Sequence, residues 1–583
     1  MSEKNLKTLT AIFIAVAMIA TMALILYQAV TPTAATPIAM EYETEIFNGE
    51  IFSVDILADD ETWQHIIDTA TDEQYTAVDV VVNGTLFKNV GIRPKGNSSL
   101  QFIAMDPDTD RFSFKIKFDE YIDGQTCFGL DVLVLNNLYE DNSYLREYIS
   151  FDMMNELGVD APLYTYADVT LNGDPWGLYL GLESYNSSFQ KRVYGNSNGY
   201  LYSAKAADIV GGGNMMPSAE MFSGNGLDLK YVGNDLASYA GFFENSIGST
   251  ADRADNTRVV EAIEVLNNYE SLDELEEYWD MEQIIPYLAA HTVSVNGDSY
   301  STFMCQNYFL YEQNGKVSIL PWDYSSTFGI LFMTDDASDI VNFPIDTPVF
   351  GVEMADRPLL EVVMENEVYK QQYHESLSIL AAYLQNIDDT AAALNALIDD
   401  YVKNDATAFC TYEEFEAARD ELIQLLLLRG ESIAGQIDGT VPATTDAQAA
   451  NPEKLINSDD LDLSLLTSPK MKGGMPPMGP SSGDGAARPM KGGMPPMGSS
   501  SGDGAAHPMK GGMPPMGMNG EMPDIETMKE MMMEMGLEAE MVDEMLAMMH
   551  GDQANPIQIA VDAFLMITLI AITLVAVVFI KKS

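Results

Sequence analysis

A chain of 583 residues that is 47% hydrophobic and 10% aromatic can bury a sizeable core, in roughly two to four domains or in one large domain with appendages. Its 30 Lys and Arg against 88 Asp and Glu residues give a formal net charge of −58, which argues against a nucleic-acid partner because such a surface needs a basic footprint. Cys127, Cys305 and Cys410 are too widely spaced for a zinc framework or a disulfide scaffold. The sequence contains no His-x-x-x-His pair, which argues against a zinc hydrolase.

Two apolar segments lie near the ends of the chain. Residues 9–30 are nearly all apolar and follow two lysines within residues 1–8, which predicts a transmembrane signal anchor or a signal peptide cleaved near Ala34. Residues 557–580 predict a C-terminal transmembrane helix, which is followed by a Lys-Lys pair. Because basic residues stay on the cytoplasmic side, residues 1–8 are expected in the cytoplasm. The sequence thus predicts localisation to the cell membrane, with the main domain extracellular.

The main domain is predicted over residues 43–438, and its first part is rich in strand patterns. In residues 112–118 apolar and polar side chains alternate, which predicts a strand with one face in the core and the other facing a cleft. The apolar face comprises Phe112, Phe114, Ile116 and Phe118, and the polar face comprises Ser113, Lys115 and Lys117.

Helices are predicted mainly in the later part of this domain. Residues 143–157 predict a helix that begins at Ser143 as N-cap and ends at Gly158. A further helical pattern covers residues 257–297, and helices dominate residues 356–436. A strand-rich part followed by a helical part predicts an α+β fold.

The stretch from Asn307 to Asp323 predicts a β-hairpin, because Asn314-Gly315 is a strong signal for a two-residue type I′ turn. With that turn, Asn307 lies opposite Trp322 and next to Asp323. An amide oxygen and a carboxylate that meet at a strand end make an oxygen-rich site suited to Mg²⁺ or Ca²⁺. Asp298 lies on a turn upstream, so the order Asp, Asn, hairpin, Asp is also that of kinase-type phosphoryl-transfer sites.

The composition changes abruptly after the main domain. Residues 440–520 are rich in Gly, Pro, Met and Ser, and the sequence Met-Lys-Gly-Gly-Met-Pro-Pro-Met-Gly begins at Met471, Met490 and Met509. This repeat predicts a disordered linker. Residues 524–550 predict a Met-rich amphipathic helix, whose thioethers suit packing on the domain or on a bilayer as well as binding a partner.

Five sequence blocks occur in order between residues 43 and 435. They are Gly-Ile-Arg-Pro-Lys-Gly-Asn-Ser-Ser at 91–99, Ser-Phe-Lys-Ile-Lys-Phe-Asp-Glu-Tyr at 113–121, Asp-Asn-Ser-Tyr-Leu-Arg at 141–146, Asn-Gly-Asp-Pro-Trp-Gly-Leu-Tyr-Leu-Gly-Leu-Glu at 172–183, and the hairpin segments within 307–329. Together they resemble the CotH kinase-like family of spore-coat proteins. The resemblance implies an atypical protein-kinase fold with a strand-rich N-terminal lobe and a helical C-terminal lobe. It does not extend to the terminal apolar segments or the Met-rich tail.

By this resemblance the domain binds ATP and Mg²⁺, with Mn²⁺ or Ca²⁺ as alternative cations. Asp298 stands at the position of the catalytic Asp, and Asn307 and Asp323 stand as the metal-binding pair. Ser325 stands where many members carry Asp or Asn. Phosphoryl transfer needs cations to neutralise charge on the phosphate oxygens and an Asp to orient the attacking hydroxyl, so these residue types suit that reaction.

The resemblance also assigns roles to basic residues on the strands. Lys115 stands as the strand lysine that holds the α- and β-phosphates, with Arg93 and Lys95 near the phosphates. Glu147 on the first helix is expected to pair with Lys115, with Glu183 as the alternative partner.

Two hypotheses of function remain open at this stage. The first is a protein kinase that transfers the ATP γ-phosphate to Ser or Thr hydroxyls of a surface or coat protein, for which a Ser-rich sequence is one candidate. The serines of the tail at 481–482 and 499–501 are candidate substrates within the same chain. The second is a kinase-like module that binds or adheres, or serves in the envelope, without catalysis. Retained acidic and basic site residues favour the first, whereas the scarcity of ATP outside a cell favours the second. In both, the membrane is a partner and nucleic acid is not.

Overall fold

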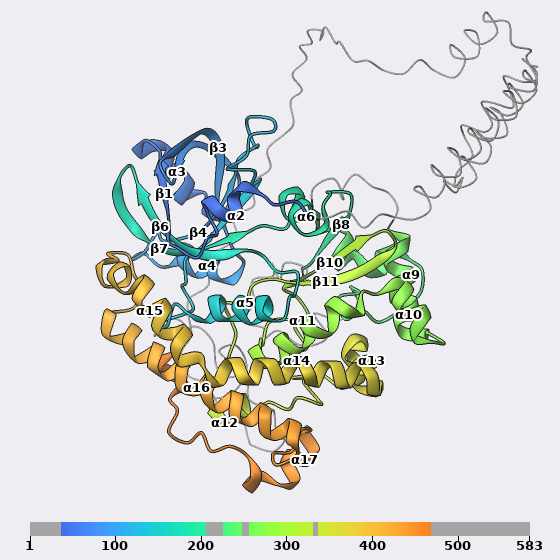
Figure 1. Ribbon diagram of the computed structural model, residues 1–583. Coiled ribbons are helices and arrows are strands. Elements are labelled where there is room, and N and C mark those ends of the chain that lie inside the picture. Colours follow the sequence, from blue (N-terminus) through green and yellow to red (C-terminus); the bar gives the residue numbers. More distant parts are fainter. Residues whose placement is uncertain (1–36, 206–224, 248–255, 330–335, 468–583) are drawn as a thin grey trace, which may run out of the picture. The chain divides into compact units, whose positions relative to one another are not determined.

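The computed structural model describes residues 37–205, 225–247, 256–329 and 336–467 (Figure 1). Strands dominate the first part of these residues and helices the second, which confirms the α+β class. The predicted segments 9–30, 524–550 and 557–580 lie outside the described residues. Within the described ranges, no helix combines the length and apolar character that crossing a bilayer requires.

Seven strands of the N-terminal part close into a barrel, in the order β1-β2-β3-β4-β5-β7-β6. The barrel closes through the parallel pair of β1 and β6, and its other neighbours are antiparallel. Sequence patterns predicted strands here but not their closure, because pairing between distant strands leaves no local signal. The strands are β1 (Phe52–Leu57), β2 (Thr76–Val82), β3 (Thr85–Lys95), β4 (Ser113–Lys117), β5 (Val132–Asn136), β6 (Tyr164–Leu171) and β7 (Asp174–Glu183).

The two faces of β5 belong to two different hydrophobic clusters. Leu133 and Leu135 pack inside the barrel, whereas Val134 packs against side chains of the helical part. A strand that is buried on both sides reads as a continuous apolar run, as Val-Leu-Val-Leu does here. The predicted apolar face of residues 112–118 is confirmed, since Phe112, Phe114, Ile116 and Phe118 are all buried in the barrel cluster.

Short helices come before β1 and between the first strands of the barrel in the chain order, and the longer α5 comes after β5. Around the barrel lie α2 (Glu41–Glu45), α3 (Asp60–Asp68), the 3-10 turn Ala70–Asp72 and α4 (Ser98–Met105). Helix α5 (Arg146–Glu156) contacts β6 on one side and α11 and α14 on the other, so it lies between the barrel and the helical part (Figure 1).

The start of α5 differs from the prediction. Ser143 is not its N-cap; instead the carboxylate of Asp141 accepts hydrogen bonds from the backbone N–H groups of Ser143 (2.9 Å) and Arg146 (2.8 Å). The buried Arg146 side chain also pairs with Asp141, with its Nε 3.1 Å from Oδ1. An aspartate can reach more than one amide at once, which is why it replaces the serine as the group that fixes this helix start.

A four-stranded sheet follows in the second part of the chain, in the order β11-β10-β8-β9. Its hairpin has the predicted register, with Tyr308 opposite Pro321 and Gln313 opposite Lys316. Asn314 (φ 53°) and Gly315 (φ 85°) both have positive φ, as a type I′ turn requires. The strands are β8 (Tyr200–Ala204), β9 (Ser246–Ile247), β10 (Tyr308–Gln313) and β11 (Lys316–Pro321).

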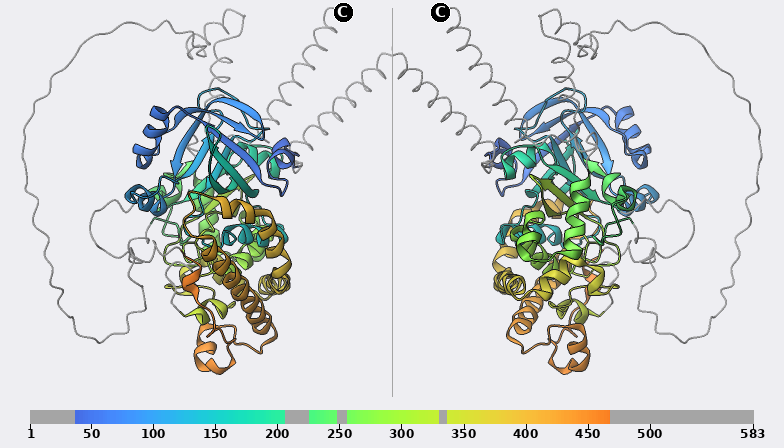
Figure 2. Two further views of the ribbon diagram at one scale, coloured as in Figure 1. Left: turned by 90° about the vertical axis from the view of Figure 1, so that its left-hand side faces the viewer. Right: turned by 90° about the vertical axis from the view of Figure 1, so that its right-hand side faces the viewer.

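Helices make up most of the remaining described chain, and the later ones, coloured yellow to orange, gather away from the blue strands of the barrel (Figure 2). Among them, α14 contacts both α11 and α16. The capping box predicted at Thr411 and Glu414 is present at the start of α16. The helices are α6 (Ser187–Tyr194), α8 (Ala240–Phe243), α9 (Thr257–Asn268), α10 (Leu272–Tyr278), α11 (Met281–Ser294), α12 (Ala337–Val341), α13 (Pro358–Glu365), α14 (Glu367–Gln385), α15 (Ile387–Asn404), α16 (Tyr412–Asp438) and α17 (Thr445–Ala450), with 3-10 turns at Leu236–Tyr239, Met354–Asp356, Pro452–Lys454 and Leu463–Leu465.

A buried ion pair joins the barrel to the helical part. Nη1 of Arg111 lies 2.6 Å from Oδ2 of Asp405, and both side chains are almost fully buried. Arg111 also donates to the carbonyl of Leu178, and the N–H of Leu178 donates to Asp405 (3.0 Å). The three cysteines are all free thiols.

The ordered chain continues beyond the predicted domain end at residue 438. Residues 440–467, predicted as the start of a disordered linker, contain α17 and return to the loop before α5. There Nδ2 of Asn142 donates to the carbonyl of Leu465 (3.2 Å), and the backbone N–H of Asn142 donates to the carbonyl of Leu466 (3.2 Å). Leu466 is fully buried. The prediction was wrong for these residues because a few specific contacts order a segment whose composition is polar.

Candidate functional site

Asp298 lies on the turn that follows α11, and two amides hold its carboxylate. Nδ2 of Asn307 donates to Oδ2 of Asp298 (2.9 Å), and Nε2 of Gln306 donates to Oδ1 (2.6 Å). The turn is closed by the Asp298 N–H, which donates to Oδ1 of Asn296 (3.0 Å). Asp298 and Asn307, predicted separately from the sequence, are therefore in direct contact.

Asp323 follows the other strand of the hairpin, and its surroundings are also specific. Asn296 donates from Nδ2 to the backbone carbonyl of Asp323 (3.3 Å), so one asparagine bonds to both aspartate-bearing turns. Asp323 (φ 55°) and Asn307 (φ 57°) both adopt left-handed backbone conformations at the hairpin end. Such conformations are costly for residues other than Gly and are common at binding and catalytic sites.

Ser325 bonds directly to Asp323. Its Oγ donates to Oδ1 of Asp323 at 2.8 Å. In this chain the residue that replaces an Asp or Asn of the resembled family therefore orients the aspartate by a hydrogen bond.

A buried histidine supports the residue after Asp323. Nδ1 of His291 lies 3.1 Å from the Tyr324 hydroxyl, and Nε2 lies 2.8 Å from Oγ of Ser301. Burial lowers the pKa of His291 to about 4, so the ring is neutral at physiological pH. His291 therefore positions the backbone next to Asp323 without adding charge.

Three further carboxylates act electrostatically with Asp323. Burial, together with the negative charges of Asp323 and Glu140, raises the pKa of Asp298 to about 8. Burial also raises the pKa of Glu147 to about 7, again with Asp323 adding to the rise. The pKa of Glu140 is raised by burial and by Asp323. Like charges that lie this close favour bound protons or cations, which is the electrostatic character of a cation-binding or proton-transfer site.

Sequence reasoning missed Glu140. It lies in the loop between β5 and α5, it is 8% exposed, and its Oε2 accepts a hydrogen bond from Oγ of Ser326 (2.9 Å). The charges of Arg146 and Lys95 partly offset the rise in its pKa. The only sequence signal was its place directly before the block Asp141–Arg146, which gives no reason to prefer it over other acidic residues nearby.

The basic residues share one face of the barrel. Arg93 pairs with Lys115 across β3 and β4, and Lys95 and Lys117 lie on the same face because side chains alternate along a strand. Arg93 is committed to an ion pair with Glu73. Lys117 bonds to Glu120 (2.8 Å), so these two cations are partly neutralised.

Lys115 makes no hydrogen bond or ion pair to another described residue. Burial, together with the neighbouring charges of Arg93, Lys95 and Lys117, lowers its pKa to about 8. An ammonium group without a counter-ion among like charges is suited to an anionic ligand.

The expected ion pair between Lys115 and Glu147 is not present. Instead, Nζ of Lys95 donates to Oδ1 of Asn136 (2.8 Å), and Nδ2 of Asn136 donates to Oε2 of Glu147 (2.8 Å). The reason is strand register: Lys115 lies across from Val134, two residues before Asn136 and further from the start of α5.

Glu183 does not join this region. Its carboxylate lies 2.6 Å from Nη2 of Arg192, and it accepts hydrogen bonds from the Tyr42 hydroxyl (2.5 Å) and the Leu163 N–H (3.1 Å). These contacts make it a buried structural acid, so the prediction of a role beside the strand lysine was wrong.

The donor set fits Mg²⁺ bound together with a phosphate. Among the described residues, no group of three or more His, Cys, Asp and Glu side chains is arranged to hold a metal ion. Mg²⁺ usually keeps several waters and binds through one or two carboxylates plus substrate phosphates. Asp323, with the amide oxygen of Asn307, could supply that smaller share of ligands.

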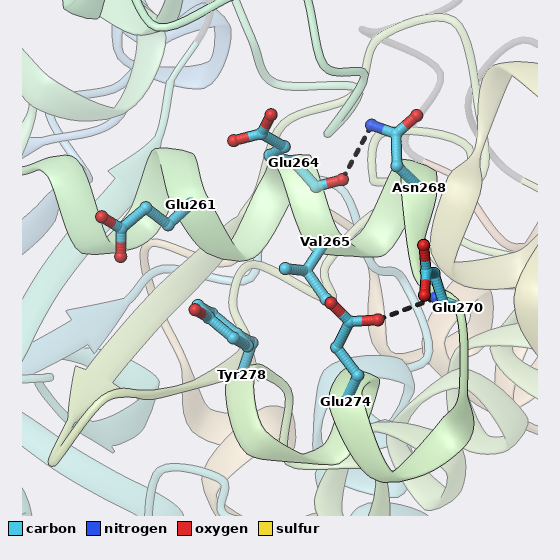
Figure 3. A pocket seen from close by; sticks show the side chains of 7 residues that line it. All are labelled: Glu261, Glu264, Val265, Asn268, Glu270, Glu274 and Tyr278. Carbon is cyan, nitrogen blue, oxygen red and sulfur yellow. Dashed lines mark hydrogen bonds between the residues drawn. The ribbon is translucent and has the colours of Figure 1, made fainter.

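A surface pocket elsewhere is lined by residues of α9 and α10 and of the turn between them, and contains none of these residues (Figure 3). Its bonds are local: Asn268 donates to the carbonyl of Glu264 (3.0 Å), and the N–H of Glu270 donates to Glu274 (2.8 Å). The pocket is therefore separate from the site around Asp298.

A family model described as CotH kinase protein matches residues 92–433. The chain belongs to this family. The match includes the candidate site residues described above, from Arg93 to Asp323, and it ends before α17.

Two curated relatives are similar over shorter stretches. Inner spore coat protein H of Bacillus subtilis (strain 168) is 25% identical over 224 residues, which cover 38% of this chain and 56% of the relative. The inner spore coat protein H-like protein of the same strain is 29% identical over 86 residues, which cover 15% of this chain and 26% of the relative. The chain thus spans about half the length of the first relative and about a quarter of the second.

Proposed function

We propose that this chain is an ATP- and Mg²⁺-dependent kinase that transfers the γ-phosphate to Ser or Thr hydroxyls of a surface or coat protein. One observation carries the proposal. Asp323 and Lys95 act with opposite sign on the same two carboxylates, Glu140 and Glu147, so the hairpin end and the basic face of the barrel lie within electrostatic range of each other. Opposed acidic and basic groups of this kind are what phosphoryl transfer needs.

The residues divide the chemistry as follows. Asp298 orients the attacking hydroxyl and accepts its proton as the new bond forms from oxygen to the γ-phosphorus and the bond to the β,γ-bridging oxygen breaks. Lys115 and Lys95 bind the phosphate oxygens. Asp323 and Asn307 would hold Mg²⁺, which supplies neutralising charge when bound.

A pKa of about 8 suits Asp298 to accept a proton near neutral pH, because a base works best when its pKa lies near the working pH. Two amides keep the carboxylate oriented toward the space that Asn307 and Asp323 border. The proposed base is therefore both tuned and positioned by neighbouring side chains.

The proposed location rests on the terminal segments and on the relatives. The relatives are named as spore coat proteins, which supports association with a coat or surface. The apolar segments 9–30 and 557–580 support attachment to the cell membrane with the domain on the outer side. This topology also favours a second candidate function, a kinase-like binding or adhesion module, because ATP is scarce outside a cell.

Isothermal titration separates the two functions. ATP with Mg²⁺, and separately with Mn²⁺, is titrated into the full-length chain in detergent, as wild type, Asp323→Ala and Asp400→Ala. Asp400 is an exposed carboxylate on α15 and serves as the matched control. We expect wild type and Asp400→Ala to bind alike and Asp323→Ala to bind at least tenfold more weakly. A wild-type chain that does not bind ATP would overturn the kinase proposal and leave the binding module.

A further inference from the structure

A chain of three side chains links two strands of the barrel to α5. Lys95 at the end of β3 donates to Asn136 at the end of β5, and Asn136 donates to Glu147 in the first turn of α5, both at 2.8 Å. Asn136 is 8% exposed and Glu147 is 2% exposed. Water therefore has little access to these bonds, which increases their strength and directional effect.

The amide of Asn136 acts as acceptor and donor at once in the middle of this chain. Oδ1 of Asn136 accepts from the ammonium while its Nδ2 donates to the carboxylate. Without the amide, Lys95 and Glu147 would favour a direct ion pair, because a charge-assisted bond is the stronger contact. Asn136 thus connects the two charged groups and also keeps them apart.

The separation leaves capacity on both charged groups. An ammonium has three N–H donors, and the bond to Asn136 uses one of them. Oε1 of Glu147 is buried and accepts no side-chain hydrogen bond from the described residues, while the backbone N–H of Tyr324 partly offsets the rise in the pKa of this carboxyl group. The side chain also lies within electrostatic range of Asp323. Lys95 thus keeps donors for an anionic ligand, and Glu147 keeps an acceptor near the proposed cation ligand.

We propose that Asn136 is a positioning residue for the nucleotide, an inference that rests on the proposed function. Its amide holds Lys95 and Glu147 at a fixed separation, so that Lys95 meets the phosphates while α5 and Glu147 keep their place beside Asp323. Loss of the amide lets Lys95 collapse onto Glu147, which withdraws the ammonium from the phosphates.

The neighbouring Asn137 provides a matched control. It is also buried, but its side chain bonds to backbone groups, donating to the carbonyl of Arg111 (2.6 Å) and accepting from the N–H of Tyr139 (3.2 Å). Asn137→Ala should therefore lower the stability of the loop and leave the intrinsic affinity for ATP unchanged.

A donor–acceptor swap tests the inference. In Asn136→Asp two carboxylates face each other and the donor to Glu147 is lost. In the double variant Asn136→Asp/Glu147→Gln, the new carboxylate accepts from Lys95 and the new amide donates back to it, so the hydrogen-bond chain is restored with unchanged net charge. We expect Mg-ATP to bind Asn136→Asp about tenfold more weakly than wild type. The double variant should recover most of that loss.

The measurements are the ATP dissociation constant by isothermal titration, kcat and KM for ATP, and the thermal midpoint, all on the full-length chain. If Asn136 has only a structural role, the double variant should recover the thermal midpoint. ATP affinity should then follow thermal stability in the Asn136 variants in the same way as it does in Asn137→Ala. Glu147→Gln is measured alone as well. If the affinity losses of Asn136→Asp and Glu147→Gln simply add in the double variant, the inference is overturned. Should Asn136→Asp fail to fold, Asn136→Ala against Asn137→Ala is decisive, and equal ATP affinity in the two overturns the inference.

The outcome also separates this inference from the proposed function. Wild type that binds ATP, with additive effects of the substitutions, overturns only the role of Asn136. Wild type that binds no ATP overturns both.

Discussion

Oγ of Ser326 donates a hydrogen bond of 2.9 Å to Oε2 of Glu140. The bond joins the turn after the hairpin to the loop that leads into α5. It therefore fixes a buried carboxylate from the barrel side within electrostatic range of Asp323 and Asp298. The charge of Asp323 adds to the raised pKa of Glu140, and the charges of Asp323 and Glu140 add to the raised pKa of Asp298.

Glu140→Gln should change the pH dependence of phosphoryl transfer. The substitution keeps an oxygen that accepts from Ser326 but removes a negative charge that raises the pKa of Asp298, which is about 8. Because Asp298 acts as a base only when deprotonated, a lower pKa moves the acid limb of the kcat/KM profile to lower pH, by about one unit. Ser326→Ala retains the charge of Glu140 and should not move the limb in that direction; an unmoved limb in Glu140→Gln would contradict the assignment.

Lys115→Arg should remove an alkaline loss of ATP affinity. The pKa of Lys115 is lowered to about 8, so its positive charge is lost as pH rises through that value. Wild-type ATP affinity should therefore fall between about pH 7.5 and 9, whereas an arginine remains charged throughout and should bind evenly. Titration calorimetry across this range gives the comparison, and Lys117→Arg is the control because Lys117 is paired with Glu120. A parallel decline in wild type and Lys115→Arg would exclude Lys115 as the titrating group.

Arg111→Met should strongly destabilise the junction between the barrel and the helical part. It leaves the carboxylate of Asp405 buried without its counter-ion, which costs about 3–5 kcal/mol of the free energy of unfolding. Chemical denaturation of the full-length chain measures the loss. The double variant Arg111→Met/Asp405→Leu removes the orphaned charge and should recover part of it. A loss below about 1 kcal/mol in the single variant would show that the ion pair is not a main link.

Leu466→Ala should destabilise the domain although this residue lies beyond the stretch that the family model matches. Leu466 is fully buried beside Asn142, so truncation creates a cavity that costs about 2–5 kcal/mol. Its neighbour Leu465 is 37% exposed, and Leu465→Ala should change stability by no more than about 0.5 kcal/mol. Thermal unfolding of both variants is the test, and equal midpoints would mean that residues 440–467 do not belong to the folded domain.

Local patterns in the sequence predicted local features well. The register of the hairpin followed from Asn314-Gly315, and the core face of β4 followed from alternation of Phe114 and Ile116 with Lys115. Both depend on interactions between residues close in sequence, in which turn geometry and side-chain alternation leave few options. The candidate residues Asp298 and Asn307 were predicted by type and order, and the structure brings them into contact.

Contacts between distant segments could not be predicted in the same way. Glu140 was missed because its importance comes from Ser326 and Asp323, which lie far along the chain. The position of Glu183 suggested a role beside the strand lysine, but Arg192 and Tyr42 occupy it. For both glutamates, the residues that they contact are brought near by tertiary packing and cannot be read from the neighbouring sequence.

By itself, the sequence determined the α+β class and the hairpin, because short-range geometry and composition specify these, and it supplied the acidic and basic residues of the candidate site. Only the tertiary structure decided that the barrel closes, that Asn136 lies between Lys95 and Glu147, and that Lys115 has no hydrogen-bond or ion-pair partner within the part of the chain that the structure describes. The physical reason is that strand register and burial place side chains from distant segments within hydrogen-bonding distance, and a shift of two residues along β5 changes which lysine meets the helix.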